Sequence, residues 1–159
     1  MNKLFIIICM SSLFADLIHP PDLGTLNYIH VKFRWNAESE INEFQFQLLN
    51  ENDGIIMDSV VVDTFLIIKN EIDWLSTYHW KVYPINDDWS PTYSFSTKES
   101  SASVHGDEET SFTAYIDPLT YNSELSLDGI TIYGLIDPYS SVAIDIEGKE
   151  IWNSNQYMF

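Results

Sequence analysis

The sequence predicts an all-β protein. From about Leu17 to Thr97, short runs of alternating apolar and polar residues are separated by clusters of turn-forming residues. No long window shows the apolar period of an amphipathic helix. Hydrophobic residues make up 45% of the 159 residues and aromatic residues 14%, which suits a packed, aromatic-rich core rather than a disordered chain.

The first fifteen residues, MNKLFIIICMSSLFA, have the pattern of an export signal. Lys3 precedes an apolar run that is too short to span a bilayer, and Ala15 offers a small residue at the expected cleavage site. Because the only cysteine, Cys9, lies in this segment, the mature chain would contain no disulfide. We therefore expect residues 1–15 to be a signal peptide and the mature chain to have no integral membrane segment. The expected location is exported: periplasmic, secreted or on a bacterial cell surface.

The strands of the first unit follow from alternation and turn chemistry. At residues 28–35, four apolar side chains alternate with three basic ones, as in a strand with one buried face. At residues 44–48 apolar side chains alternate with glutamine, and the Asp-Gly step in residues 50–54 predicts a hairpin turn. The remaining predicted strands cover residues 55–62, 65–68, 77–85 and 93–97.

Residues 98–110, KESSASVHGDEET, contain almost no apolar side chains and are predicted to be a flexible linker. Beyond the linker, the strand candidates are residues 112–116, 129–133, 141–146 and 150–152. These are too few for a second independent domain. We therefore expect residues 111–159 to be an incomplete β-rich segment.

Three stretches stand out in the first unit: WLSTYHWKVYPIN from Trp74, Trp89-Ser90-Pro91, and YSFST from Tyr93. Together they give the unit a resemblance to a fibronectin type III domain. It covers residues 17–97 and implies a seven-stranded immunoglobulin-like β-sandwich. Trp35 and Trp80 would lie in the core, and Tyr78 would form a tyrosine corner, returning its hydroxyl group to nearby backbone.

The C-terminal segment contains DGITIYG from Asp128 and YSSVAIDIEGKEIWN from Tyr139. These two stretches resemble the entry to the β-propeller of exported bacterial arylsulfotransferase-like proteins. Asp145 would cap the turn, Gly148 would adopt the left-handed conformation, and Trp152 would pack against the next blade. One blade cannot bury its own faces, so the resemblance implies that this chain is the N-terminal part of a longer, truncated protein.

The expected function is that of a non-catalytic spacer or docking module for the chain's own downstream propeller. The net charge of −17 excludes nucleic acid as a favoured partner. One alternative is an adhesion module that binds carbohydrate or a surface protein. Another is that the full-length parent is a sulfotransferase acting on phenolic compounds through a propeller histidine. No position in this chain matches that catalytic motif, so the chain as it stands is not expected to be an enzyme.

The sequence predicts no catalytic, cofactor-binding or metal site. The four histidines, His19, His30, His79 and His105, are scattered without ligand spacing, and we expect them to be exposed. Acidic clusters at residues 87–88 and 107–109 are assigned to turn capping rather than to calcium binding. Trp74 and Trp89 lie in predicted loops, where each would either contact a ligand or a partner surface, or cover the end of the sandwich.

Overall fold

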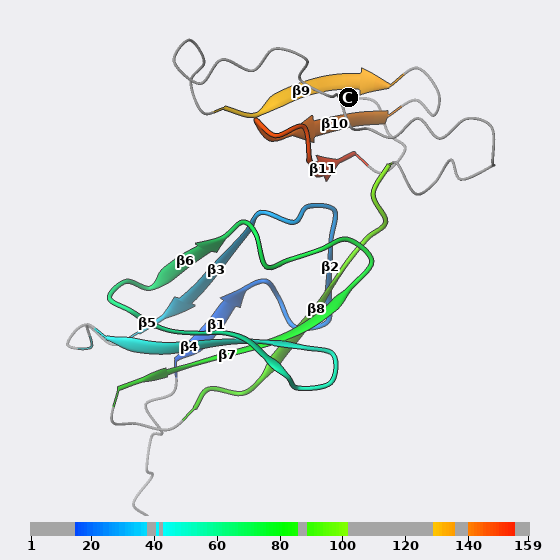
Figure 1. Cartoon of the computed structure of the whole chain (residues 1–159). Helices are drawn as coiled ribbons and strands as arrows, with labels where there is room; N and C mark the ends of the chain where they lie inside the picture. Colours follow the sequence, from blue (N-terminus) through cyan, green and yellow to red (C-terminus); the bar gives the residue numbers. More distant parts are fainter. Residues whose placement is uncertain are drawn as a thin grey trace, which may run out of the picture.

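The computed structural model describes residues 15–37, 41, 43–85, 89–101, 129–135 and 140–154. Within these residues the chain forms two sheets of a sandwich and a third, C-terminal sheet (Figure 1). The sandwich strands are β1 (Asp16–His19), β2 (Gly24–Leu26), β3 (Val31–Asn36), β4 (Phe44–Asn50), β5 (Ile55–Val61), β6 (Phe65–Ile68), β7 (Thr77–Pro84) and β8 (Tyr93–Thr97). The predicted signal segment up to residue 14 lies outside the described residues, as do residues 102–128.

The two sandwich sheets have the strand orders β1-β3-β6 and β2-β8-β7-β4-β5. All pairings are antiparallel except that of β2 with β8, which is parallel. The predicted all-β sandwich class is therefore confirmed. The described sandwich contains eight strands where seven were predicted. The additional strand arises because the chain before β3 forms two short strands that pair with different sheets.

The strand boundaries agree closely with the alternation of the sequence. The predicted strands at residues 65–68 and 93–97 coincide with β6 and β8. The strand predicted at residues 28–35 begins instead at Val31, because the three residues after Asn27 turn toward the C-terminal sheet. In β3 the burial alternates strictly, with Val31, Phe33 and Trp35 buried and the residues between them exposed.

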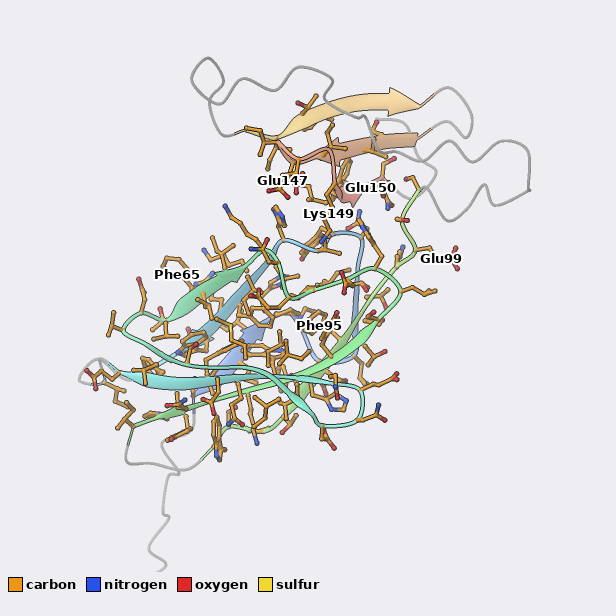
Figure 2. All side chains as sticks on the ribbon, viewed as in Figure 1. Phe65, Phe95, Glu99, Glu147, Lys149 and Glu150 are labelled. Atoms are coloured by element: carbon orange, nitrogen blue, oxygen red, sulfur yellow. The ribbon has the colours of Figure 1, made fainter. Side chains whose placement is uncertain are left out.

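Aromatic side chains fill the space between the two sandwich sheets. Phe33 makes edge-to-face contacts with Phe46, Trp80 and Phe95, with ring centroids 5.0, 5.2 and 5.8 Å apart. Figure 2 shows Phe95 projecting into this layer. Trp35 and Trp80 are both fully buried, as predicted. The sandwich therefore has a continuous aromatic core of its own.

The C-terminal sheet contains β9 (Thr131–Leu135), β10 (Ser140–Ile144) and β11 (Glu150–Asn153), in the antiparallel order β11-β10-β9. The turn between β10 and β11 has the predicted chemistry. Asp145 Oδ1 accepts hydrogen bonds from the backbone N–H groups of Glu147 and Lys149 at 3.0 and 2.9 Å. Gly148 has a φ of 84°, in the left-handed region that favours glycine. The strand predicted at residues 112–116 lies outside the described residues.

Candidate functional site

The C-terminal sheet joins the sandwich through backbone hydrogen bonds. The N–H of Ile29 donates to the carbonyl of Ile151 at 3.0 Å, and the N–H of Asn153 donates to the carbonyl of Asn27 at 3.1 Å. These two bonds flank an antiparallel bridge between Tyr28 and Trp152. The chain between β2 and β3 thus acts as a further short strand beside β11. We call this region the junction: residues 27–29 together with β11 and the side chains that contact them.

Side chains from both units reinforce the junction. Ala143 and Ile151 are buried in the same apolar cluster as the sandwich core, and Trp152 packs against that cluster. In the described structure Trp152 therefore contacts the sandwich, and its packing against a further blade stays a prediction. Asn27 Nδ2 also donates a hydrogen bond to the carbonyl of Asn153 at 2.6 Å. The sandwich and the C-terminal sheet consequently share part of one buried surface.

Trp74 reaches the junction from the loop before β7. Its indole Nε1 donates a hydrogen bond to the carbonyl of Glu150 at 3.1 Å, and its half-buried ring packs against the core cluster. Ser76 Oγ donates to the carbonyl of Trp74 at 3.0 Å and fixes the loop locally. The sequence left two roles open for Trp74, contact with a ligand or partner and covering of the end of the sandwich. Its position matches the second role.

A tyrosine corner holds the loop that carries Trp74. The hydroxyl group of Tyr78 accepts a hydrogen bond from the backbone N–H of Asp73 at 2.8 Å, as the sequence predicted. Leu75 adopts a positive φ of 52°, and its N–H donates to the carbonyl of Lys98 at 3.0 Å. Thr97 Oγ1 donates to the carbonyl of Asp73 at 2.7 Å. These hydrogen bonds fix the backbone of the loop and therefore the direction in which the Trp74 side chain points.

Glu150 places a buried carboxylate in the junction. Only 6% of this residue is exposed. Its Oε1 accepts hydrogen bonds from the Ser101 N–H and from Asn153 Nδ2, both at 2.8 Å, whereas Oε2 has no partner among the described residues. Figure 2 shows Glu150 between the sandwich and the C-terminal sheet. Because Ser101 follows β8, this carboxylate joins the described start of the predicted linker to β11.

An open cleft lies beside the junction, with a volume of about 670 Å³. Its sandwich side carries His30, Lys69 and Asn70, and its C-terminal side includes Ile130, Asp145 and Glu147. Both signs of charge face this space. One carboxylate oxygen of Asp145 is already occupied by the two backbone N–H groups of its turn. The cleft is therefore a mixed polar surface rather than a site selective for one ionic ligand.

The histidines near the junction are half-buried, which corrects the prediction that they would be exposed. Burial lowers the pKa of His30, with further lowering from Lys69 and Lys149 and an opposing effect from Asp145. His19 Nε2 lies 2.9 Å from the hydroxyl oxygen of Tyr28, and burial lowers the pKa of His19 as well. Packing of the C-terminal sheet and of Tyr28 against the sandwich covers these two rings.

Trp89 lies away from the junction, on the outer face of the five-stranded sheet. Its ring is half-buried and meets the ring of Tyr83 edge-to-face at a centroid distance of 4.0 Å. The Lys81 ammonium lies 4.6 Å from the centre of the Trp89 ring. Side chains of β7 therefore cover part of the ring surface that a ligand would use. The structure does not bring Trp74 and Trp89 together.

The other predicted sites contribute no cluster. His79 is half-buried rather than exposed, because its Nδ1 lies 2.9 Å from an Asp53 carboxylate oxygen in the β4–β5 turn. His105 and the acidic clusters at residues 87–88 and 107–109 lie outside the described residues. Among the residues that the structure describes, no group of three His, Cys, Asp or Glu side chains is arranged to hold a metal ion. The described part of the chain also contains no helix long and apolar enough to cross a membrane.

Sequence reasoning missed the junction itself. Its central contacts are backbone hydrogen bonds at Ile29 and Asn153, which leave no pattern in side-chain polarity. One usable signal was present: Glu150 directly precedes the apolar Ile151 and Trp152, so a buried partner for its carboxylate was worth seeking. The described residues 98–101 are also fixed more firmly than a free linker, since Lys98 and Ser101 both donate backbone hydrogen bonds.

No family model matches the chain, and no curated protein is significantly similar to it. The resemblance to arylsulfotransferase-like proteins therefore stays a prediction.

Proposed function

We propose that the sandwich is a non-catalytic docking module that holds the β-rich segment following it in the chain. The single observation that carries this proposal is the strand pairing of residues 27–29 with β11. Backbone pairing fixes register and direction, so it specifies how the next segment starts. The buried Glu150 and the indole of Trp74 add side-chain contacts at the same place.

We also infer that the module has a fibronectin type III-like fold. The strand orders β1-β3-β6 and β5-β4-β7-β8, together with the tyrosine corner at Tyr78, support a fibronectin type III-like sandwich. Export rests on the signal-peptide pattern of residues 1–15, and a longer parent chain carrying a propeller rests on the sequence resemblance alone. A sulfotransferase activity would belong to that parent, since the described residues offer no assembled catalytic group.

Hydrogen exchange of the full chain tests the docking proposal. The amides of Ile29 and Asn153 should exchange slowly, because both donate across the junction. Trp74→Phe removes the indole N–H donor to the Glu150 carbonyl and keeps a smaller aromatic ring at the same place. One hydrogen bond contributes about 0.5–1.5 kcal/mol, so exchange at both amides should accelerate by about 2- to 10-fold.

Trp89→Phe is the matched control, because it changes a tryptophan that does not contact the junction. It should leave exchange at Ile29 and Asn153 unchanged. If both amides exchange at unprotected rates in the unmodified chain, the sandwich does not dock the following segment. An adhesion role would then become the preferred hypothesis for the sandwich.

A further inference from the structure

The outer edge of β5 is an unpaired strand edge with apolar side chains. β5 is the last strand in its sheet order, and it pairs through its inner edge with β4. None of the described residues pairs with its outer edge. Ile55 is 60% exposed and Val60 57% exposed on this seven-residue strand. Natural proteins commonly protect such an edge with lysine, proline or a covering segment, because its free backbone groups pair readily with another chain.

The two faces of β5 differ in what they offer a neighbouring strand. On the inner face, Met57 and Val61 pack against the core cluster and are half-buried. On the outer face, Val60 pairs with Gln45 of β4 and Asp58 pairs with Gln47. Val60 and Asp58 are therefore neighbours along this face of β5. A strand added beside β5 would therefore meet Met57, Ser59 and Val61 on one face and an apolar residue next to a carboxylate on the other.

The Asp58 carboxylate is held in position on this outer face. Gln47 Nε2 donates to its Oδ2 at 2.8 Å, and Gln45 Nε2 donates to its Oδ1. Each carboxylate oxygen still has acceptor capacity after these bonds. Asp58 is exposed and forms no salt bridge within the described residues. An added strand with a cationic side chain opposite Asp58 would supply the missing counter-charge.

The charge of the surrounding sequence selects the same kind of partner. From Trp35 to Ile68 the chain contains seven acidic residues and no lysine or arginine. A second copy of this chain is disfavoured, because antiparallel pairing of two full-length β5 strands would set Asp58 opposite Asp58. The net charge of −17 adds long-range repulsion between copies.

We propose that the outer edge of β5 is a docking site for an extended segment of a partner protein, with a basic residue between apolar ones on the face beside Asp58. The partner adds a strand to the five-stranded sheet through backbone hydrogen bonds. Its basic side chain lies opposite Asp58, and its apolar side chains meet Val60 and Ile56, which lies at the bulge between Ile55 and Met57 in the pairing with β4. This site is separate from the junction and does not depend on the docking function proposed above.

A pair of short capped peptides tests the proposal on the full chain. One peptide has the sequence Val-Thr-Arg-Val-Val, and its match has glutamate in place of arginine. In an NMR titration, the arginine peptide should perturb the β5 amides and slow their hydrogen exchange, and added salt should weaken its binding. The glutamate peptide should bind about two- to five-fold more weakly or not at all.

Variants on the exposed face of β5 sharpen this test without disturbing the core. Asp58→Asn should weaken arginine-peptide binding about two- to five-fold, and Asp58→Lys should reverse the preference between the two peptides. Glu71→Gln, in the exposed loop after β6, removes the same charge elsewhere and should leave binding unchanged. Equal affinity for both peptides, or perturbation centred away from β5, would overturn the proposal. If protection of the β5 amides from exchange increases with protein concentration when no peptide is present, the edge binds a second copy of this chain instead.

Discussion

The sandwich buries its own aromatic core, whereas the C-terminal sheet buries its apolar residues partly against the sandwich. Phe33, for example, contacts three other fully buried aromatic rings. In the described C-terminal residues, by contrast, Ala143 and Ile151 belong to the sandwich cluster, while Ile130 and Ile132 remain exposed. Val142 and Ile144 are also buried, outside that cluster, but a three-stranded sheet that shares part of its buried surface with the sandwich depends in part on what it packs against. The sandwich can therefore hold its own structure, whereas the C-terminal sheet depends in part on the sandwich.

The largest expected effect is on the sandwich. Trp80→Ala removes a fully buried ring from the aromatic core and should lower the free energy of unfolding by about 3–5 kcal/mol. Denaturant unfolding followed by circular dichroism measures this change. If the C-terminal sheet depends on the sandwich, protection of the β11 amides should be lost in parallel.

Ile132→Ala is the control for this first prediction, because Ile132 is 69% exposed on β9. It should change the free energy of unfolding by less than about 0.5 kcal/mol. Retention of β11 protection in a Trp80→Ala chain whose sandwich has unfolded would contradict the dependence of the C-terminal sheet.

A smaller and more local effect is expected at the junction. Glu150→Ala removes the acceptor for the Ser101 N–H and one acceptor of Asn153 Nδ2, which also donates to the Glu99 carbonyl at 3.2 Å, so the buried Ser101 N–H loses this partner. Local opening of β11 should become easier by about 1–3 kcal/mol, with little change in the sandwich. Site-resolved hydrogen exchange of β11 against β7 separates the two regions.

Glu147→Ala, at an exposed residue of the turn before β11, provides the comparison for Glu150→Ala. It should leave β11 protection nearly unchanged. Equal loss of protection in β7 and β11 after Glu150→Ala would mean that the sandwich and the C-terminal sheet open as one unit.

The smallest expected effect is a pH dependence of the junction. Burial lowers the folded-state pKa values of His19 and His30 below the ordinary value of 6.5. The folded state therefore binds fewer protons than the unfolded state. The resulting contribution to the free energy of unfolding is fully present above pH 6.5. It decreases as the pH falls below 6.5 and levels off below the lowered folded-state pKa. Hydrogen exchange at Ile29, measured from about pH 8 to about pH 5 and corrected for the intrinsic rate, should show this decrease.

His19→Asn and His30→Asn isolate the contribution of each ring. Each substitution should flatten the pH dependence at Ile29 without changing the exchange of the β7 amides. An unchanged pH profile in the double variant would mean that neither histidine causes the dependence.

The sandwich was predictable because its signals are carried by side chains. The alternation of Val31, Phe33 and Trp35 fixes which face of β3 is buried, and the Tyr78 hydroxyl makes the expected corner bond to Asp73. Turn chemistry was equally readable at Asp145 and Gly148. In each case local conformation and burial both follow from a few adjacent residues.

The junction was not predictable in the same way. Its pairing joins Ile29 to Ile151 and Asn27 to Asn153, residues more than a hundred positions apart that interact through backbone atoms. The half-burial of His30 has the same origin, since residues of the C-terminal segment form the facing wall of its cleft. Polarity patterns report which face of a strand is buried, but not which distant segment covers it.

The parallel pairing of β2 with β8 has a mechanical consequence. Gly24, Thr25 and Leu26 lie in register with Phe95, Ser96 and Thr97, and backbone bonds at Leu23 and Lys98 close the two ends of the pair. Tension applied to β2 from its N-terminal side and to β8 from its C-terminal side slides the two strands past each other. All the bonds of the pair then carry the load together, rather than opening one after another. The sandwich is thereby built to resist stretching between the segments that precede β2 and follow β8.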